Sequence, residues 1–158
     1  MRTSPNTIPG LILLVTVGVL SAAYSAQYIG GLRPCILCLY SRIPWFVAGG
    51  LMLVTILMHF SGPGRRGILL LTGLALLAGT GISVYHVGVE QGYFQPPSAC
   101  SAQDIPANLQ QLKALLNTAA PPRCDEIPWE MYGISLAGFN VIASFAMALA
   151  AFVGIRRA

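Results

Sequence analysis

Residues 34–42 read PCILCLYSR, in which two cysteines are separated by two residues and an arginine follows one helical turn later. This CxxC motif lies between two long apolar segments, so we expect it at one end of a bundle of membrane-spanning helices. A disulfide between cysteines this close closes a very small loop, contributes little stability and is typically exchangeable. The motif therefore favours redox or metal chemistry over a purely structural role.

The composition is that of a membrane protein. Of the 158 residues, 55% are hydrophobic and 9% are charged, whereas a typical soluble domain has about 25% charged residues. The formal net charge is +4, but the nine basic residues are dispersed along the chain and form no basic stripe. We therefore expect a lipid bilayer around the chain and no nucleic-acid partner.

Four apolar segments are long enough to cross a hydrocarbon core of about 30 Å. We predict spans over about residues 8–28, 43–60, 67–87 and 131–153, within a single domain over residues 1–158. The first segment can also be read as a cleaved signal peptide. Its apolar run is longer than the roughly 7–15 residues of a signal sequence, so we interpret it as a retained helix. The expected fold is an all-α, four-transmembrane-helix bundle.

Two loops are expected at the end of the bundle that carries the CxxC motif. The shorter loop covers about residues 29–42, and the longer one, rich in proline and glycine, covers about residues 88–130. Within the longer loop, leucines recur at steps of three and four residues, which predicts a short helix over residues 105–117 on the membrane surface. The long loop is the segment expected to meet a water-soluble partner.

The distribution of charge predicts the orientation of the chain. With four spans, both termini and the loop at residues 61–66 share one side, which carries five basic residues and no acidic residue. The positive-inside rule makes this side cytoplasmic. All four cysteines then lie on the other side, which we expect to be the periplasm, an oxidising compartment where disulfides persist.

The four cysteines form two candidate pairs, Cys35 with Cys38 and Cys100 with Cys124. A structural staple is a serious alternative for the second pair, because closing a loop of that size is worth roughly 3 kcal/mol in chain-entropy models. Zinc bound by four thiolates is a weaker alternative, since structural zinc sites usually have two close pairs of ligands and Cys100 and Cys124 are far apart. We expect redox chemistry and no metal.

Arg42 lies one helical turn after Cys38. On a helix the two side chains share a face, so the guanidinium can hold a Cys38 thiolate or polarise an electron acceptor above it. Spacing alone equally allows Arg42 to extend to the lipid headgroups. The sequence has no CxxCH motif, and we interpret it as lacking a dinucleotide-binding fingerprint as well. Electrons from the thiols are therefore expected to pass to a lipid-soluble acceptor such as a quinone.

Five motifs along the chain together point to one family. They are the CxxC with its arginine, YHVGVE at residues 85–90, PSACS at 97–101, CDE at 124–126 and WEMYGISLAGFN at 129–140. With these motifs the sequence closely resembles, over nearly its whole length, the DsbB family of bacterial inner-membrane thiol:quinone oxidoreductases. The resemblance implies an enzyme that reoxidises a periplasmic DsbA-like carrier with a thioredoxin fold. It also implies transfer of two electrons to ubiquinone or menaquinone, which sustains disulfide bond formation.

The resemblance also implies a role for each site residue. Cys100 would accept attack by the carrier's thiolate and release Cys124, which would then attack Cys35. Cys38 would be left as the thiolate that faces the quinone, with Arg42 stabilising the developing negative charge. The following residues would complete the site and its supports: His86 near the quinone-side histidine of the family, Glu90 as a tether for the loop, and Asn140 as a bridge between helices.

Other functions remain open on the sequence alone. A four-helix bundle with a CxxC is also the arrangement of reductant conduits and of vitamin K epoxide reductase-like enzymes. A DsbI-like paralogue would serve a dedicated thiol partner instead of a general carrier. A non-catalytic membrane scaffold, with its loop stapled from Cys100 to Cys124, is the third kind of alternative.

Overall fold

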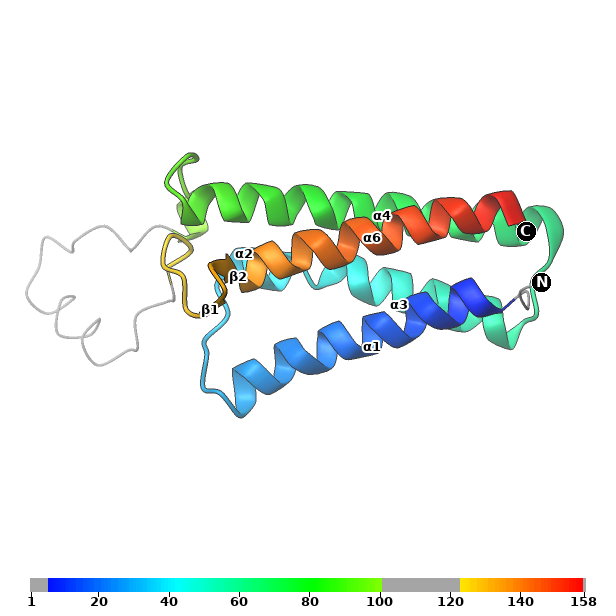
Figure 1. The fold of residues 1–158 in the computed structure, drawn as a ribbon, viewed down its shortest axis with the longest axis horizontal. Helices are drawn as coiled ribbons and strands as arrows, with labels where there is room; N and C mark the ends of the chain where they lie inside the picture. Colours follow the sequence, from blue (N-terminus) through cyan, green and yellow to red (C-terminus); the bar gives the residue numbers. More distant parts are fainter. Residues whose placement is uncertain (1–5, 101–122, 158) are drawn as a thin grey trace, which may run out of the picture.

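The computed structural model describes residues 6–100 and 123–157, which form a bundle of antiparallel helices with a small hairpin at one end (Figure 1). The long helices are α1 (Thr7–Tyr28), α3 (Ile43–Leu57), α4 (Gly62–Glu90) and α6 (Leu136–Arg157). The short elements are α2 (Ile36–Tyr40), the 3-10 helix η1 (Ser98–Cys100), and the strands β1 (Glu130–Met131) and β2 (Ile134–Ser135). The helix predicted over residues 105–117 lies outside the described residues.

Four helical segments of the described chain are long and apolar enough to cross a membrane: α1, the continuous segment Ile36–Leu57 formed by α2 and α3, α4, and α6. Large apolar side chains are exposed along the outer face of the bundle, among them Leu14, Leu71 and Ile142. Such a surface suits contact with lipid rather than water. The predicted all-α fold with four membrane-spanning helices is confirmed.

The helices close around a common core because each packs against two neighbours. α4 packs on α3 and α6, and α1 packs on the same two helices. The side chains at the centre include Ile12, Trp45, Met52, Leu69 and Leu76, all almost fully buried. The first turn of α1, the last turn of α6 and the connection from α3 to α4 lie together at one end (Figure 1). The CxxC segment lies at the opposite end.

A glycine sets the distance between α3 and α4. At Gly79 of α4, an added Cβ would lie 2.9 Å from the Cβ of Pro44 in α3, which is closer than side chains tolerate. Small residues at such positions let transmembrane helices approach one another closely. This contact brings the first turn of α3 against α4.

The predicted boundaries of the second and third spans need correction. The second spanning segment begins at Ile36 instead of residue 43, so Cys38 lies in its first turn and Cys35 directly precedes it. Its helix ends at Leu57, because the chain turns at His59, whose φ of 51° lies in the left-handed region. The third span was expected over about residues 67–87, but α4 runs from Gly62 to Glu90. The sequence pattern predicts a loop rich in proline and glycine from residue 88, but the helix continues and the His86 and Glu90 side chains near its end are buried and lie 3.7 Å apart.

The predicted start of the fourth span is also wrong. Residues 130–135 form a two-stranded antiparallel hairpin, in which Glu130 pairs with Ser135, and α6 begins only at Leu136. The turn of the hairpin consists of Tyr132 and Gly133, both with positive φ, as tight hairpin turns require. At its other end α6 extends to Arg157, where basic side chains are favoured by the helix dipole.

Candidate functional site

The CxxC motif forms the first turn of α2. Cys35 is the N-cap residue, with extended backbone, and its sulfur accepts a hydrogen bond from the backbone N–H of Cys38 at 3.3 Å. The two sulfurs lie 3.0 Å apart and are joined by a hydrogen bond, not by a disulfide. Cys35 is buried, whereas Cys38 is partly exposed. The structure therefore shows this pair in its dithiol form.

His86 of α4 contacts the sulfur of Cys35. Its Nε2 lies 3.5 Å from the Cys35 Sγ, and the ring is almost completely buried. The hydrogen bond between the Cys35 and Cys38 side chains lowers the pKa of the Cys35 thiol, and His86 acts in the same direction, while burial opposes both. The thiolate of the reduced pair is therefore favoured on Cys35. From the sequence a thiolate is expected on Cys38 instead, but in a different state of the protein. In that state Cys35 is bonded to Cys124, and only Cys38 can carry the negative charge.

The second cysteine pair lies against the first. Cys100 of η1 and Cys124 are joined by a disulfide, with their Cα atoms 5.5 Å apart. Both are buried in one cluster with Cys35, Leu37 and Val89. The cluster forms because α2 packs on η1 and on the end of α4. Cys35 is thus buried within the cluster that contains the second pair, while the partly buried Cys38 packs against this cluster.

Cys38 lines a cavity inside the bundle. The cavity has a volume of about 310 Å³ and is bounded by the ends of α1, α3, α4 and α6. Most of its wall is apolar, and its polar wall includes Arg42, Gln27, His86 and Asn140. The structure therefore brings Cys38, Arg42 and His86, which the sequence analysis singled out separately, to one cavity.

Contacts with α1 hold Arg42 at the wall of this cavity. Its Nη1 donates a hydrogen bond to Gln27 Oε1 at 2.7 Å, and the guanidinium lies over the ring of Tyr24, 4.9 Å from its centre. These two contacts join Arg42 to α1, and it shares the cavity wall with Cys38. Sequence reasoning missed Gln27 and Tyr24, because nothing in the spacing of α1 indicates which side chains face the CxxC.

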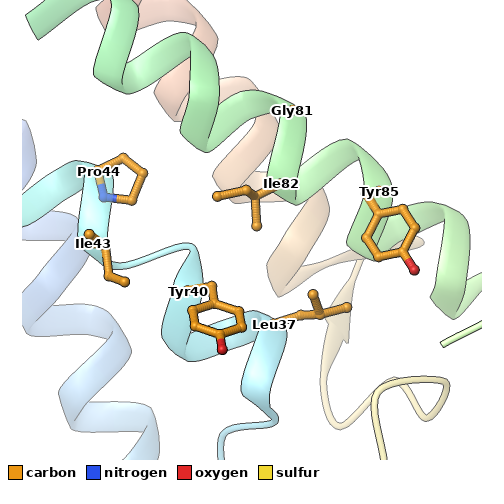
Figure 2. Close-up of a pocket in the computed structure, with 7 residues that line it drawn as sticks. All are labelled: Leu37, Tyr40, Ile43, Pro44, Gly81, Ile82 and Tyr85. Atoms are coloured by element: carbon orange, nitrogen blue, oxygen red, sulfur yellow. The ribbon is translucent and has the colours of Figure 1, made fainter. Parts of the chain in front are cut away.

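A second hollow lies on the outer side of α2. Figure 2 shows it between α2, the start of α3 and α4, with Leu37, Tyr40, Ile82 and Tyr85 around it. Its volume is about 470 Å³ and its wall is almost wholly apolar. Neither cysteine of the CxxC lines this groove, so it offers no direct path to the sulfurs.

A chain of polar contacts links the site to the hairpin. Glu90 Oε1 lies 3.7 Å from His86 Nε2, and Glu90 Oε2 accepts a hydrogen bond of 2.5 Å from Ser135 Oγ. Asn140 joins three helices, since its Oδ1 accepts from Trp45 Nε1 at 2.8 Å and its Nδ2 donates to Ser83 Oγ at 2.6 Å. Asn140 bridges helices as expected, and Glu90 joins α4 to β2.

The family can now be stated from comparison with known proteins. The family model described as "Disulfide bond formation protein DsbB" matches residues 5–154. The chain belongs to the DsbB family. It is similar to Disulfide bond formation protein B of Marinobacter nauticus, at 31% identity over 94% of this chain and 90% of the relative. No solved structure matches it significantly.

Two further relatives show the same breadth of similarity. Disulfide bond formation protein B of Shewanella amazonensis is 31% identical over 85% of this chain and 80% of that protein. A protein of Rickettsia prowazekii, named RP370, is 28% identical over 91% of this chain and 84% of its own length. Membership of the DsbB family, together with the four spanning helices, shows a multi-pass membrane protein that acts as an oxidoreductase in disulfide bond formation.

The structure argues against zinc bound by four thiolates, because Cys100 and Cys124 are bonded to each other. The sulfurs of Cys35 and Cys38 and the Nε2 of His86 lie within 4.8 Å of one another. Three donor atoms do not by themselves identify a metal centre, since structural zinc is usually held by four. The absence of a metal stays a prediction for this member of the DsbB family.

One sequence interpretation needs correction. Residues 62–67 read GPGRRG, which fits the spacing of the dinucleotide motif GxGxxG that the sequence was interpreted as lacking. A dinucleotide site needs this motif between a strand and a helix. Here the segment follows α3 and forms the first turns of α4, at the end of the bundle opposite the cysteines. The segment therefore matches the spacing of the motif but not the structure that a dinucleotide site requires.

Proposed function

We propose that this protein reoxidises a periplasmic DsbA-like dithiol carrier by disulfide exchange and passes the two electrons to a membrane quinone, ubiquinone or menaquinone. One observation carries the proposal. Cys35 lies in the same buried cluster as the Cys100–Cys124 disulfide, while Cys38, one turn later, lines a largely apolar cavity within the bundle. The CxxC thus adjoins both an exchangeable disulfide and a space within the membrane-spanning part.

The exchange steps follow from this arrangement. A thiolate of the carrier attacks Cys100, the Cys100–Cys124 bond breaks, and Cys124 leaves as a thiolate. The carrier's second thiolate then displaces Cys100 and releases the oxidised carrier. Cys124 attacks Cys35 in the oxidised CxxC, so that the Cys35–Cys38 bond breaks and Cys38 is left as a thiolate. Cys100 then attacks Cys124, which re-forms the Cys100–Cys124 disulfide and releases Cys35, so that the CxxC is left as a dithiol. Each step makes one S–S bond and breaks one, as thiol–disulfide exchange requires.

The cavity suits a quinone. A ring with two carbonyl oxygens and an apolar tail needs a mostly apolar wall with a few polar groups, which is the wall found here. A bound quinone supplies the acceptor for two electrons and two protons. Arg42, fixed by Gln27, faces the developing negative charge with a permanent positive charge, and Cys38 presents its sulfur to the same space. His86 and Asn140 are the further polar groups that can orient the ring.

The proposed location is the bacterial inner membrane, with both chain termini in the cytoplasm and the cysteines in the periplasm. The ends of α1 and α6 and the α3–α4 connection share one end of the bundle (Figure 1). Basic residues are concentrated at that end, which supports its cytoplasmic assignment. The CxxC, the disulfide and the hairpin lie at the opposite end.

The proposal is tested by following quinone reduction spectroscopically, with purified protein and a reduced thioredoxin-fold carrier. We expect turnover by the unaltered protein and none by Cys38→Ser. Ser25→Ala on the exposed face of α1 is a matched control that should retain full activity. Normal turnover by Cys38→Ser would contradict the proposed mechanism.

The direction of electron flow is tested separately by trapping. Cys124→Ser should accumulate in cells as a mixed disulfide between Cys100 and its partner, whereas Cys100→Ser should not. Capture of a general thioredoxin-fold oxidant supports the proposal, and capture of one dedicated protein indicates a DsbI-like paralogue. Capture of a reductase would instead favour a reductant conduit, and vitamin K epoxide reductase-like activity would be detected as epoxide turnover.

A further inference from the structure

A buried glutamate adjoins the site, and the exchange steps above do not use it. The Glu90 side chain is 2% exposed, although carboxylates are almost never fully buried unless they are paired. Its two oxygens have different neighbours. Oε2 accepts the hydrogen bond from Ser135 Oγ at 2.5 Å, and Oε1 lies 3.7 Å from His86 Nε2. The carboxylate is therefore fixed on one side and directed toward His86 on the other.

His86 connects this carboxylate to the CxxC. The same nitrogen that lies near Glu90 is 3.5 Å from the Cys35 sulfur. His86 also lines the cavity that contains Cys38. Nε2 is thus the one atom of the ring that neighbours a thiol and a carboxylate, both of them buried.

Ser135 determines where the carboxylate lies. Its hydroxyl oxygen accepts a hydrogen bond from the backbone N–H of Gly138 at 3.2 Å, in the first turn of α6. The hydroxyl hydrogen is then directed to Glu90. Because Ser135 belongs to β2 and precedes α6 directly, the position of Glu90 depends on the hairpin and on α6 together. A charge of this kind held by two elements is preorganised, not mobile.

We propose that Glu90 is a positioning residue for proton transfer from Cys35: its carboxylate, held 3.7 Å from His86 Nε2, favours uptake of the Cys35 proton at that nitrogen by stabilising the imidazolium that forms. The inference deepens the proposed function, and the role of Glu90 in turnover rests on that function. When the dithiol returns to a disulfide, two S–H bonds break, one S–S bond forms, and two electrons and two protons leave. The electrons pass to the quinone, which takes up two protons in becoming the quinol.

The two protons leave from different places. Cys38 faces the cavity and releases its proton there. Cys35 is buried against His86, and its proton moves to Nε2. His86 lines the cavity as well, so this proton can also reach the reduced acceptor. Cys35 and Glu90 contact His86 but do not line this cavity, and the titratable and charged groups that line it together with His86 are Cys38, Arg42 and Arg33.

The test measures how the reactivity of Cys35 depends on pH, in the reduced full-length protein without carrier or quinone. Alkylation by iodoacetamide is quantified at Cys35 by peptide mass spectrometry. We expect Glu90→Gln to move the midpoint of the profile to higher pH by about one unit, which is about a tenfold lower rate below the midpoint. Glu90→Asp should recover part of the shift. Glu130→Gln, which alters an exposed glutamate of β1, should match the unaltered protein.

A second variant covers the case in which Glu90→Gln does not fold. Ser135→Ala keeps the carboxylate but removes its hydrogen bond, so a smaller shift in the same direction is expected. Superimposable profiles for the unaltered protein and the folded Glu90 or Ser135 variants would overturn the inference. Failure of the proposed function is a separate outcome, since it is a lack of quinone reduction by the unaltered protein, which this assay does not involve.

Discussion

His86 of α4 places its Nε2 3.5 Å from the Cys35 sulfur of α2, across 51 positions of sequence. This contact distinguishes the two cysteines of the CxxC. Cys35 has His86 and the backbone N–H of Cys38 as neighbours and lies beside the Cys100–Cys124 disulfide. Cys38 instead opens onto the cavity with Arg42. One sulfur is thus arranged for disulfide exchange and the other for electron transfer, which supports the order of steps proposed above.

The first prediction concerns which sulfur reacts in the dithiol form. By exposure alone, Cys38 should be alkylated faster, because Cys35 is 5% exposed. The lowered pKa of Cys35, caused mainly by its hydrogen bond with Cys38, predicts the reverse. The Cys35 thiolate should persist as the pH falls through the ordinary thiol range and disappear only near its own lower pKa. Site-resolved alkylation of reduced protein at neutral pH checks this, and faster labelling of Cys38 would contradict it.

A related prediction follows for stability. Because the pKa of Cys35 is lower in the folded protein than in the unfolded chain, its thiolate stabilises the reduced fold above the ordinary thiol pKa. This contribution is lost as the pH falls through the folded pKa of Cys35. The melting temperature of the reduced protein should therefore fall further on acidification than that of a Cys35→Ser variant. If the melting temperatures of the two proteins fall equally with pH, the assignment of the thiolate to Cys35 is contradicted.

The next prediction concerns Arg42 and its support in α1. Arg42→Lys keeps the charge but loses the planar guanidinium that donates to Gln27 and lies over Tyr24. We expect a higher KM for quinone, by about tenfold, a free-energy change typical of a hydrogen bond to a charged group. Gln27→Ala should shift KM in the same direction but less. Arg156→Lys, at the other end of the bundle, is the control, and an unchanged KM in Arg42→Lys would contradict the proposed role.

Part of this fold and site could be predicted from the sequence, because hydrophobic length and cysteine spacing are local properties. The four spans and the separation of the CxxC from the basic end follow from them. The hairpin was missed because Met131, Ile134 and Leu136 continue the apolar character of the last span, while the positive φ of Tyr132 is not visible in a sequence pattern. The end of α4 was likewise placed too early, because the loop rich in proline and glycine was expected to begin at residue 88.

Most contacts within the site could not be predicted from the sequence, because they depend on how the helices pack in three dimensions. Gln27 and Ser135 carry no motif, and their importance comes only from lying opposite Arg42 and Glu90. His86 and Glu90 are one helical turn apart, so their proximity is readable from sequence once α4 is known to reach Glu90. The contact between His86 and Cys35 depends on the packing of α2 on α4, which local patterns do not specify.

Asn140 provides a test of the polar network in the bundle. Asn140→Ala would leave the Trp45 indole N–H without its partner and remove the hydrogen bond that Ser83 Oγ accepts, while Ser83 keeps its own hydrogen bond to the Gly79 carbonyl. Losing such buried hydrogen bonds costs about 1–3 kcal/mol each, so we expect a clearly lower melting temperature in detergent. Ser25→Ala on the exposed face of α1 should have no effect. A melting temperature unchanged by Asn140→Ala would show that the network contributes no stability.

Two glycines of α4 form a matched pair for testing how closely the helices pack. At Gly79 an added Cβ would lie 2.9 Å from Pro44, whereas at Gly81 nothing lies within 4 Å. Gly79→Ala should therefore push α3 away from α4 and destabilise the bundle by about 1–3 kcal/mol, the range for overpacked positions. Gly81→Ala should be neutral or stabilising, because alanine favours the helix by about 1 kcal/mol over glycine. Thermal unfolding of both variants in the same detergent decides the matter. If Gly79→Ala is as stable as Gly81→Ala, α3 and α4 are not held at the separation that places the CxxC against His86.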